Sequence, residues 1–144
     1  MSFEICQGEV MRNQKIVIGA PLVIDGRKLS LSRAIRAGDH VYLTGQIPMQ
    51  DGRPMTTGSI EDQTRAVLDA ITETLSLAGC TRGDVVKAMV WLRDRADFPG
   101  FNTVYGAYFP DDPPARSAII SDLLVDCRVE VEVVAWQPQP KAGA

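Results

Sequence analysis

Runs of valine, isoleucine and leucine, several of them alternating with polar residues, predict β-strands along much of the chain. The alternation is clearest near the C-terminal end, where valines occupy one side of a strand and Glu130 and Glu132 the other. Turns are expected between extended runs at Asp25-Gly26, Gly38-Asp39 and Asp51-Gly52. The predicted strands are Lys15–Ile18, Leu31–Arg36, Val41–Thr44, Val85–Leu92, Ala115–Ser121 and Arg128–Trp136.

Two segments repeat their apolar positions with the period of an α-helix. Ser59 is expected to cap the first helix and Gly79 to end it. Asp97 is expected to cap the second helix, with Pro99 in its first turn. The predicted core-facing residues are Ile60, Thr64, Val67, Leu68, Ile71, Leu75 and Ala78 in the first helix, and Phe98, Phe101, Val104, Tyr105, Tyr108 and Phe109 in the second.

This order of strands, helix, strand, helix and strands predicts an α+β layer fold. The length of 144 residues suits one domain, with residues 1–25 as an irregular N-terminal extension and residues 137–144 as a tail. The segment Val85–Leu92 is apolar at both odd and even positions, so both of its faces should be covered. Two helices cover only one face, and we expect another subunit to cover the other.

Charge and composition narrow the classes of partner. The net charge of −3 and a pI near 5.1, without a run of lysine or arginine, argue against nucleic acid as a partner. Three cysteines, Cys6, Cys80 and Cys127, do not make a disulfide framework and predict a reducing compartment. Without a signal peptide or a long apolar stretch, the expected location is the cytoplasm, with no membrane partner.

The candidate chemistry lies in the last two predicted strands. Arg116, in Pro114-Ala115-Arg116-Ser117, can bind a small carboxylate with two parallel hydrogen bonds. Glu130, on the next strand, would then lie beside that cation, stay ionised, and position a water or move a proton. The alternatives are that Arg116 pairs with a core or interface carboxylate, and that Glu130 faces solvent.

The remaining reactive side chains give no indication of a catalytic or metal-binding site. His40 is the only histidine, so a histidine-based triad or metal site is not expected. Cys127 has no histidine nearby in the sequence and is predicted to be a small buried residue rather than a nucleophile. We therefore expect no metal.

A series of short motifs between residues 31 and 136 resembles the RidA/YjgF family of reactive-intermediate deaminases. Each motif alone is weak, but they occur in the family's order. They are Ser32-Arg33-Ala34-Ile35-Arg36-Ala37-Gly38-Asp39, Thr44-Gly45-Gln46-Ile47-Pro48, Gln63-Thr64, Asp84-Val85-Val86-Lys87, Asp97-Phe98, Asn102-Thr103-Val104-Tyr105, Pro114-Ala115-Arg116-Ser117 and Val129-Glu130-Val131-Glu132.

The resemblance implies a chorismate-mutase-like fold, a mixed sheet with two helices on one face. It also implies a homotrimer with ligand clefts between subunits. The implied activity is hydrolysis of 2-imino and 2-enamino acids to 2-oxo acids and ammonia, with no cofactor. Some members have been described as ribonucleases or translation inhibitors, but the acidic pI argues against that here.

By position, Arg116 resembles the carboxylate-binding arginine of the family and Glu130 the acidic residue that holds the water. Gly45 matches a glycine whose backbone faces the ligand, Asn102 an asparagine lining the cleft, and Ser32 the serine of a Pro-Tyr-Ser segment. Two matched positions depart from the family: Leu31 replaces the tyrosine, and Ala118 stands where cysteine or threonine is common.

These departures leave three hypotheses open. The first is a deaminase of small 2-imino acids. The second is a deaminase of a longer catabolic amino acid, such as an aminomuconate, because Leu31 and Ala118 would give a roomier and more apolar cleft. The third is a non-catalytic trimer that binds small carboxylates.

Overall fold

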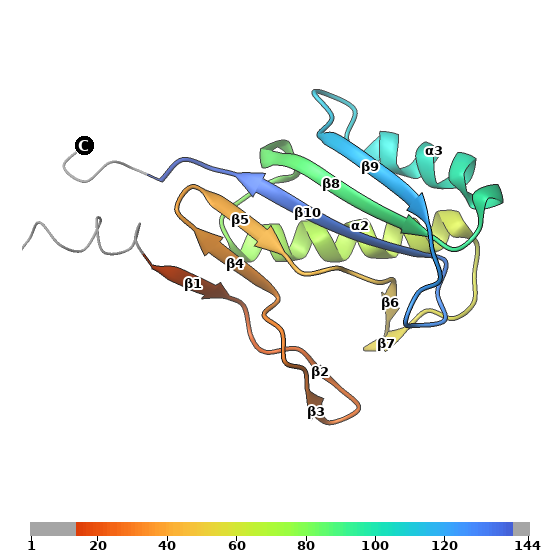
Figure 1. Cartoon of the computed structure of the whole chain (residues 1–144), viewed down its shortest axis with the longest axis horizontal. Coiled ribbons are helices and arrows are strands. Elements are labelled where there is room, and N and C mark those ends of the chain that lie inside the picture. The colour runs from red at the N-terminus through yellow and green to blue at the C-terminus, as the bar shows by residue number, and fades with distance from the viewer. Residues whose placement is uncertain (1–13, 140–144) are drawn as a thin grey trace, which may run out of the picture.

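A computed structural model describes residues 14–139, and its centre is a six-stranded mixed sheet (Figure 1). The strand order is β1-β4-β5-β10-β8-β9, antiparallel except for the parallel pair β8 and β9. All six predicted strands are present, with ends that differ by up to three residues. Their bounds are β1 Lys15–Ile18, β4 Ala34–Ala37, β5 His40–Leu43, β8 Val85–Leu92, β9 Ala115–Ile120 and β10 Val129–Trp136.

Two helices, α2 (Ile60–Leu77) and α3 (Phe98–Tyr108), pack on one face of this sheet (Figure 1). α3 lies in the crossover between β8 and β9, the kind of connection that parallel neighbours require. Valines of β10 and β8 form one buried cluster with the apolar faces of both helices. The predicted mixed α+β sheet with two helices on one face is therefore confirmed.

Two short hairpins lie outside the main sheet. β2 (Val23–Ile24) pairs with β3 (Arg27–Lys28), and β6 (Met49–Gln50) pairs with β7 (Arg53–Pro54). The turns predicted at Asp25-Gly26 and Asp51-Gly52 connect these strands.

The first 25 residues are less irregular than predicted. β1 pairs with β4 along its whole length, as the strand predicted at residues 15–18 allows. β2 belongs to a hairpin, so the prediction of an irregular segment is wrong for residues 23–24. Residues 1–13 of the predicted extension, with Cys6, and residues 140–144 of the predicted tail lie outside the described residues. Within the tail, Gln137 accepts a hydrogen bond from the buried Arg36 at 3.0 Å, which attaches this segment to β4.

The helix caps follow the prediction in α2 but not in α3. The Ser59 side chain accepts a hydrogen bond from the backbone of Asp62 at 3.1 Å, and Gly79 has the positive φ of a C′ residue. Asp97 precedes α3, but its side chain caps nothing. Its carboxylate instead binds Arg128 at 3.1 Å, because the start of β10 lies alongside the turn η3 (Arg95–Asp97).

The sheet face away from the helices is open in the single chain. Along β8, Ala88, Val90 and Leu92 are buried against the helices, whereas Lys87, Met89 and Trp91 alternate with them on the other side. This open face is the one that another subunit was expected to cover, and that expectation stays a prediction. None of the helices among residues 14–139 has the length and apolarity that a membrane crossing needs.

Two glycines of α3 differ in what surrounds them. A Cβ at Gly100 would lie 2.7 Å from Ile60 Cγ2 and overlap the Glu61 carboxylate, whereas one at Gly106 would meet nothing within 4 Å. Gly100 thus lets α3 approach the start of α2, and Gly106 has no such role.

We predict that Gly100→Ala lowers the free energy of unfolding by about 1–3 kcal/mol through overpacking. Gly106→Ala, the matched control on the same helix, should raise it by about 0.5–1 kcal/mol through helix propensity. Urea unfolding of both variants at one protein concentration measures the difference. Equal effects of the two substitutions would contradict the proposed close approach of the helices.

Candidate active site

Arg116 lies on the edge strand β9 and points to the face that carries the helices. It is aligned with the buried Ala88 of β8, and aligned residues of paired strands share a face. Its guanidinium carbon lies 4.7 Å from the centre of the Tyr105 ring, 5.6 Å from that of Phe101 and 5.8 Å from that of Phe98. Three aromatic rings of α3 therefore hold this cation by cation–π attraction.

The cation held by these rings lacks an acidic partner within its own chain. Among residues 14–139, Arg116 forms no ion pair with an aspartate or glutamate. The neighbouring Tyr105 hydroxyl is buried without a hydrogen-bond partner, and burial raises its pKa while Arg116 opposes that rise. A pairing of Arg116 with a core carboxylate is thereby excluded within the described part of the chain.

Two more predicted site residues are close to Arg116 in the fold. Asn102 lies on α3, one turn beyond Phe98 and therefore on the same side of the helix. Ala118 follows Arg116 by two residues and so shares its side of β9. We call Arg116, Asn102 and Ala118 the arginine half-site.

Glu130 lies on the central strand β10 and points to the opposite, open face. Val129 and Val131 on either side of it are buried against the helices. Its carboxylate lies directly over Gly45, where a Cβ would overlap Oε1 and come within 3.3 Å of Cδ. The backbone of Gln46 fixes this approach by exchanging two hydrogen bonds with Val131, of 2.8 and 3.0 Å.

Ser32 and Leu31 precede β4 at the same end of the sheet as Gly45. The Thr44 amide donates to the Arg33 carbonyl at 3.1 Å, which extends the β4–β5 pairing toward Ser32. Ser32 is half-buried, and Leu31 is 42% exposed. We call Glu130, Gly45, Ser32 and Leu31 the glutamate half-site.

The environment of Glu130 favours its protonated form. Burial raises the pKa of its carboxyl above the usual value, and the charge of Glu132 on the same side of β10 raises it further. The prediction that Arg116 lies beside Glu130 and lowers this pKa is therefore wrong within one chain.

The strand order explains that error. β9 and β10 are consecutive in sequence, but β8 lies between them in the sheet. Glu130 is aligned with Trp91 of β8 on the open face, whereas Arg116 is aligned with Ala88 on the helix face. The two half-sites thus face away from each other, on opposite sides of the sheet.

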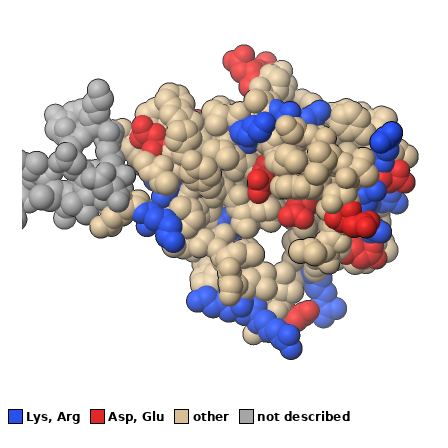
Figure 2. Space-filling model, in the orientation of Figure 1, with Lys and Arg blue, Asp and Glu red and all other residues tan. Residues whose placement is uncertain are grey.

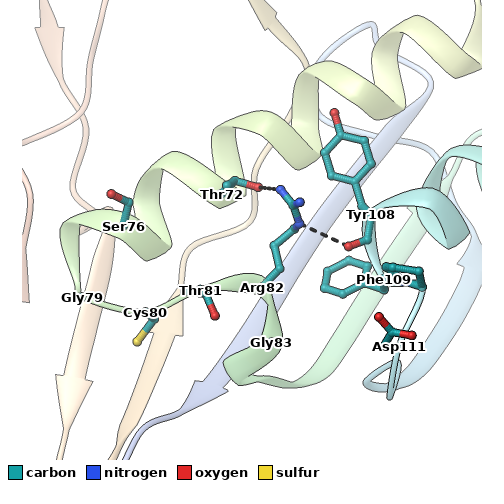
Figure 3. A pocket seen from close by; sticks show the side chains of 11 residues that line it. Thr72, Ser76, Gly79, Cys80, Thr81, Arg82, Gly83, Tyr108, Phe109 and Asp111 are labelled. Atoms are coloured by element: carbon teal, nitrogen blue, oxygen red, sulfur yellow. Dashed lines mark hydrogen bonds between the residues drawn. The ribbon is translucent and has the colours of Figure 1, made fainter.

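A larger pocket, of about 680 Å³, lies elsewhere, between the end of α2, the turn η2 (Arg82–Asp84) and the end of α3 (Figure 3). The cation Arg82 in its lining is already engaged, because it donates to Thr72 Oγ1 at 3.0 Å and to the Tyr108 carbonyl at 3.2 Å. These contacts connect the two helices. None of the predicted site residues lines this pocket. No sequence pattern indicated that a pocket would form here.

A smaller pocket, of about 250 Å³, adjoins the arginine half-site. Ala118 lines it together with Phe98, which was predicted to be core but is 39% exposed. Arg95 also lines it and was missed, because an isolated arginine before a helix carries no distinctive pattern.

Cys127 is buried, as predicted, and burial raises the pKa of its thiol.

The protein therefore has an α+β fold in which an arginine held by aromatic rings lies on one face of the sheet and a half-buried glutamate lies on the other face. Residues 27–137 match the family model described as endoribonuclease L-PSP. A RutC family protein of Pyrococcus horikoshii is 41% identical over 108 residues, which cover 74% of this chain and 86% of that protein. The chain belongs to the RidA/YjgF family, also represented by these RutC proteins.

Two further relatives are informative. The 3-aminoacrylate deaminase RutC of Acinetobacter baylyi is 38% identical over 104 residues, covering 71% of this chain and 82% of that protein. The crystal structure of yeast Mmf1 superimposes with a TM-score of 0.78 at 30% identity, covering 86% of this chain and 99% of that one.

The raised pKa of Glu130 predicts a specific effect on stability. A carboxyl whose pKa is higher in the folded than in the unfolded state lowers the free energy of unfolding when the pH is above both pKa values. This loss of stability disappears as the pH falls below the pKa of the unfolded state. Glu130→Gln should therefore raise the urea midpoint at pH 7, and the gain should shrink as the wild-type carboxyl becomes protonated. Glu132→Gln, on an exposed neighbour, is the control and should change the midpoint less. A lower midpoint for Glu130→Gln at pH 7 would contradict the burial cost.

Proposed function

We propose that this protein hydrolyses reactive 2-imino and 2-enamino acids to 2-oxo acids and ammonia, at sites formed between the subunits of a homotrimer. The observation that carries the proposal is Arg116, a cation held by three aromatic rings without an acidic partner among residues 14–139. A bidentate carboxylate ligand would supply that partner. Kinship to a protein named 3-aminoacrylate deaminase supports the same reaction class.

The separation of the half-sites supports an assembly of several copies. One chain cannot bring Glu130 against Arg116, because they are on opposite faces of its own sheet. A second copy packed on the open face could bring its arginine half-site to the glutamate half-site of the first. The open face also carries apolar side chains that such packing would cover, including Ile119 at 47%, Tyr42 at 47% and Trp136 at 48% exposed.

In the proposed reaction, Arg116 of one copy holds the substrate carboxylate, which fixes the C=N carbon near Glu130 of another copy. Glu130 removes a proton from a water as the water oxygen bonds to that carbon and the C=N π electrons move to nitrogen, which takes up that proton from the Glu130 carboxyl. Glu130 then takes the hydroxyl proton of the carbinolamine and passes it to the amino nitrogen, so that the C=O bond forms as the C–N bond breaks and ammonia leaves. An enamine first takes a proton on carbon to become the imine.

The environment of Glu130 suits both directions of proton transfer. Burial raises the pKa of the Glu130 carboxyl, which makes its carboxylate a stronger base. Gly45 lets the Glu130 carboxylate lie close over the backbone, so that a ligand placed by Arg116 of another copy would meet it there. Asn102 and Ser32 would contribute polar contacts to the ligand, and Leu31 and Ala118 apolar ones.

The charge pattern favours a small acid over RNA as ligand, although the family model carries a ribonuclease name. On the face seen in Figure 2, basic side chains gather over the β2–β3 hairpin and are otherwise interspersed with acidic ones. With a net charge of −3, this surface has little general attraction for a phosphate backbone.

Arg116 variants test the binding step. Arg116→Ala should weaken binding of a 2-oxo acid by ~2–5 kcal/mol, because a desolvated charged contact is lost. Arg116→Lys should restore only part of it, since one ammonium cannot reproduce the fork of a guanidinium. Calorimetric titration with pyruvate measures both variants. Full affinity in the lysine variant would contradict bidentate binding.

Mixed trimers test the location of the site. Arg116→Ala and Glu130→Gln chains should each be nearly inactive alone, with the glutamine variant reduced ~10²–10⁴-fold in turnover. Refolded together in equal amounts, they should regain about one quarter of wild-type activity, because each mixed ring contains one site built from two intact half-sites. Ammonia release from freshly generated 2-iminopropionate is the readout.

Sedimentation of the same samples should give a species of about three times 15.7 kDa. A stable monomer, or inactivity of verified mixed trimers, would contradict a shared site. If 2-oxo acids bind but wild-type protein releases no ammonia faster than water does, the protein is a carboxylate binder and not a deaminase.

A further inference from the structure

The pocket beside the arginine half-site has the position and chemistry of a side-chain subsite. It has a volume of about 250 Å³. Its lining includes Ala118 and Ile120, which share the side of β9 that carries Arg116, and Ile119, which alternates to the other side at the sheet edge. Phe98 belongs both to the rings that hold the guanidinium and to the wall of this pocket. A ligand whose carboxylate is bound by Arg116 can therefore extend along β9 into it, since Ala118 is only about 7 Å further along the strand.

The walls of the pocket are mainly apolar. It is lined by Leu92, Arg95, Phe98, Ala118, Ile119 and Ile120. Leu92 forms its buried floor, and the two isoleucines are about half exposed. Within the described part of the chain, Arg95 is the only charged residue of the lining, and it lies in the exposed turn η3.

We propose that this pocket receives the side chain of the substrate, and that the protein prefers 2-imino acids with an apolar side chain of about three to five carbons. This inference rests on the proposed deaminase function and names its substrate class. The volume is close to the lower end of ligand pockets, which excludes large side chains and leaves room for one such as that of leucine. Ala118 is the position that opens the pocket, because a longer side chain there would fill it.

The preference should be measurable in the wild-type protein. Burying several extra methylenes in an apolar pocket should raise kcat/KM for the leucine-derived imine about 10- to 100-fold over the alanine-derived imine. Both imines can be generated in situ by an L-amino-acid oxidase, with ammonia release compared to the uncatalysed rate.

Two substitutions should move that preference in opposite directions. Ala118→Leu fills the pocket and should lower the ratio of the two kcat/KM values at least tenfold. Ile120→Ala enlarges it and should shift the preference toward the phenylalanine-derived imine. Ala107→Leu, an exposed alanine of α3 outside both half-sites, is the control and should leave the ratio unchanged. The variants are compared only after sedimentation shows the wild-type assembly. If Ala118→Leu loses that assembly, Ile120→Ala decides, and an unchanged preference in the assembled variant would overturn the proposal.

Binding of 2-oxo acids separates this proposal from the proposed function. Calorimetry should give tighter binding of 4-methyl-2-oxopentanoate than of pyruvate, with the difference lost in Ala118→Leu, whether or not imines are turned over. Equal affinities, or an equal loss for both acids, would overturn the subsite and leave the deaminase intact. Tighter binding of 2-oxoadipate than of 4-methyl-2-oxopentanoate, abolished in Arg95→Met, would also overturn it in favour of a dicarboxylate substrate.

Discussion

The two-residue period of the central strand β10 is the constraint on which both the core and the candidate site depend. β10 pairs with β5 on one side and β8 on the other, so its register is fixed along both edges. Val129, Val131 and Val133 fill the space under the helices, which forces Glu130 and Glu132 onto the open face. A slip of one residue would bury two carboxylates and expose the valines, so packing energy fixes the direction of Glu130.

Local patterns predicted most of the elements, because strand alternation, helix periodicity, caps and turns are encoded by near neighbours. The apolar face of α2 and the turn at Gly79 match in detail. The predictions that failed depended on distant partners. The Asp97 carboxylate binds Arg128, 31 residues away, rather than its own helix. Likewise, β8 separates β9 from β10, which no pattern within either strand could reveal.

The candidate residues were identifiable one by one, but their arrangement was not. Arg116 and Glu130 were found from residue type, strand position and family resemblance, whereas the faces to which they point depend on the alignment of three strands. The aromatic residues of α3 were interpreted as core alone. Phe101 and Tyr105 are indeed buried, yet their rings also hold the Arg116 guanidinium, so one apolar stripe stabilises the fold and orients a charge. Periodicity cannot distinguish these two uses.

The pocket beside Arg116 lies at the margin of the protein rather than within its core. Of its lining residues, only Leu92 belongs to the buried cluster; Ala118, Ile119 and Ile120 are exposed on an edge strand. Substitutions at such exposed positions usually change the free energy of unfolding by no more than about 0.5 kcal/mol in either direction. The shape of this pocket can therefore drift during evolution almost independently of foldability. Members of one lineage could acquire different ligand preferences through single substitutions on β9 without any compensating change in the sheet or the helices.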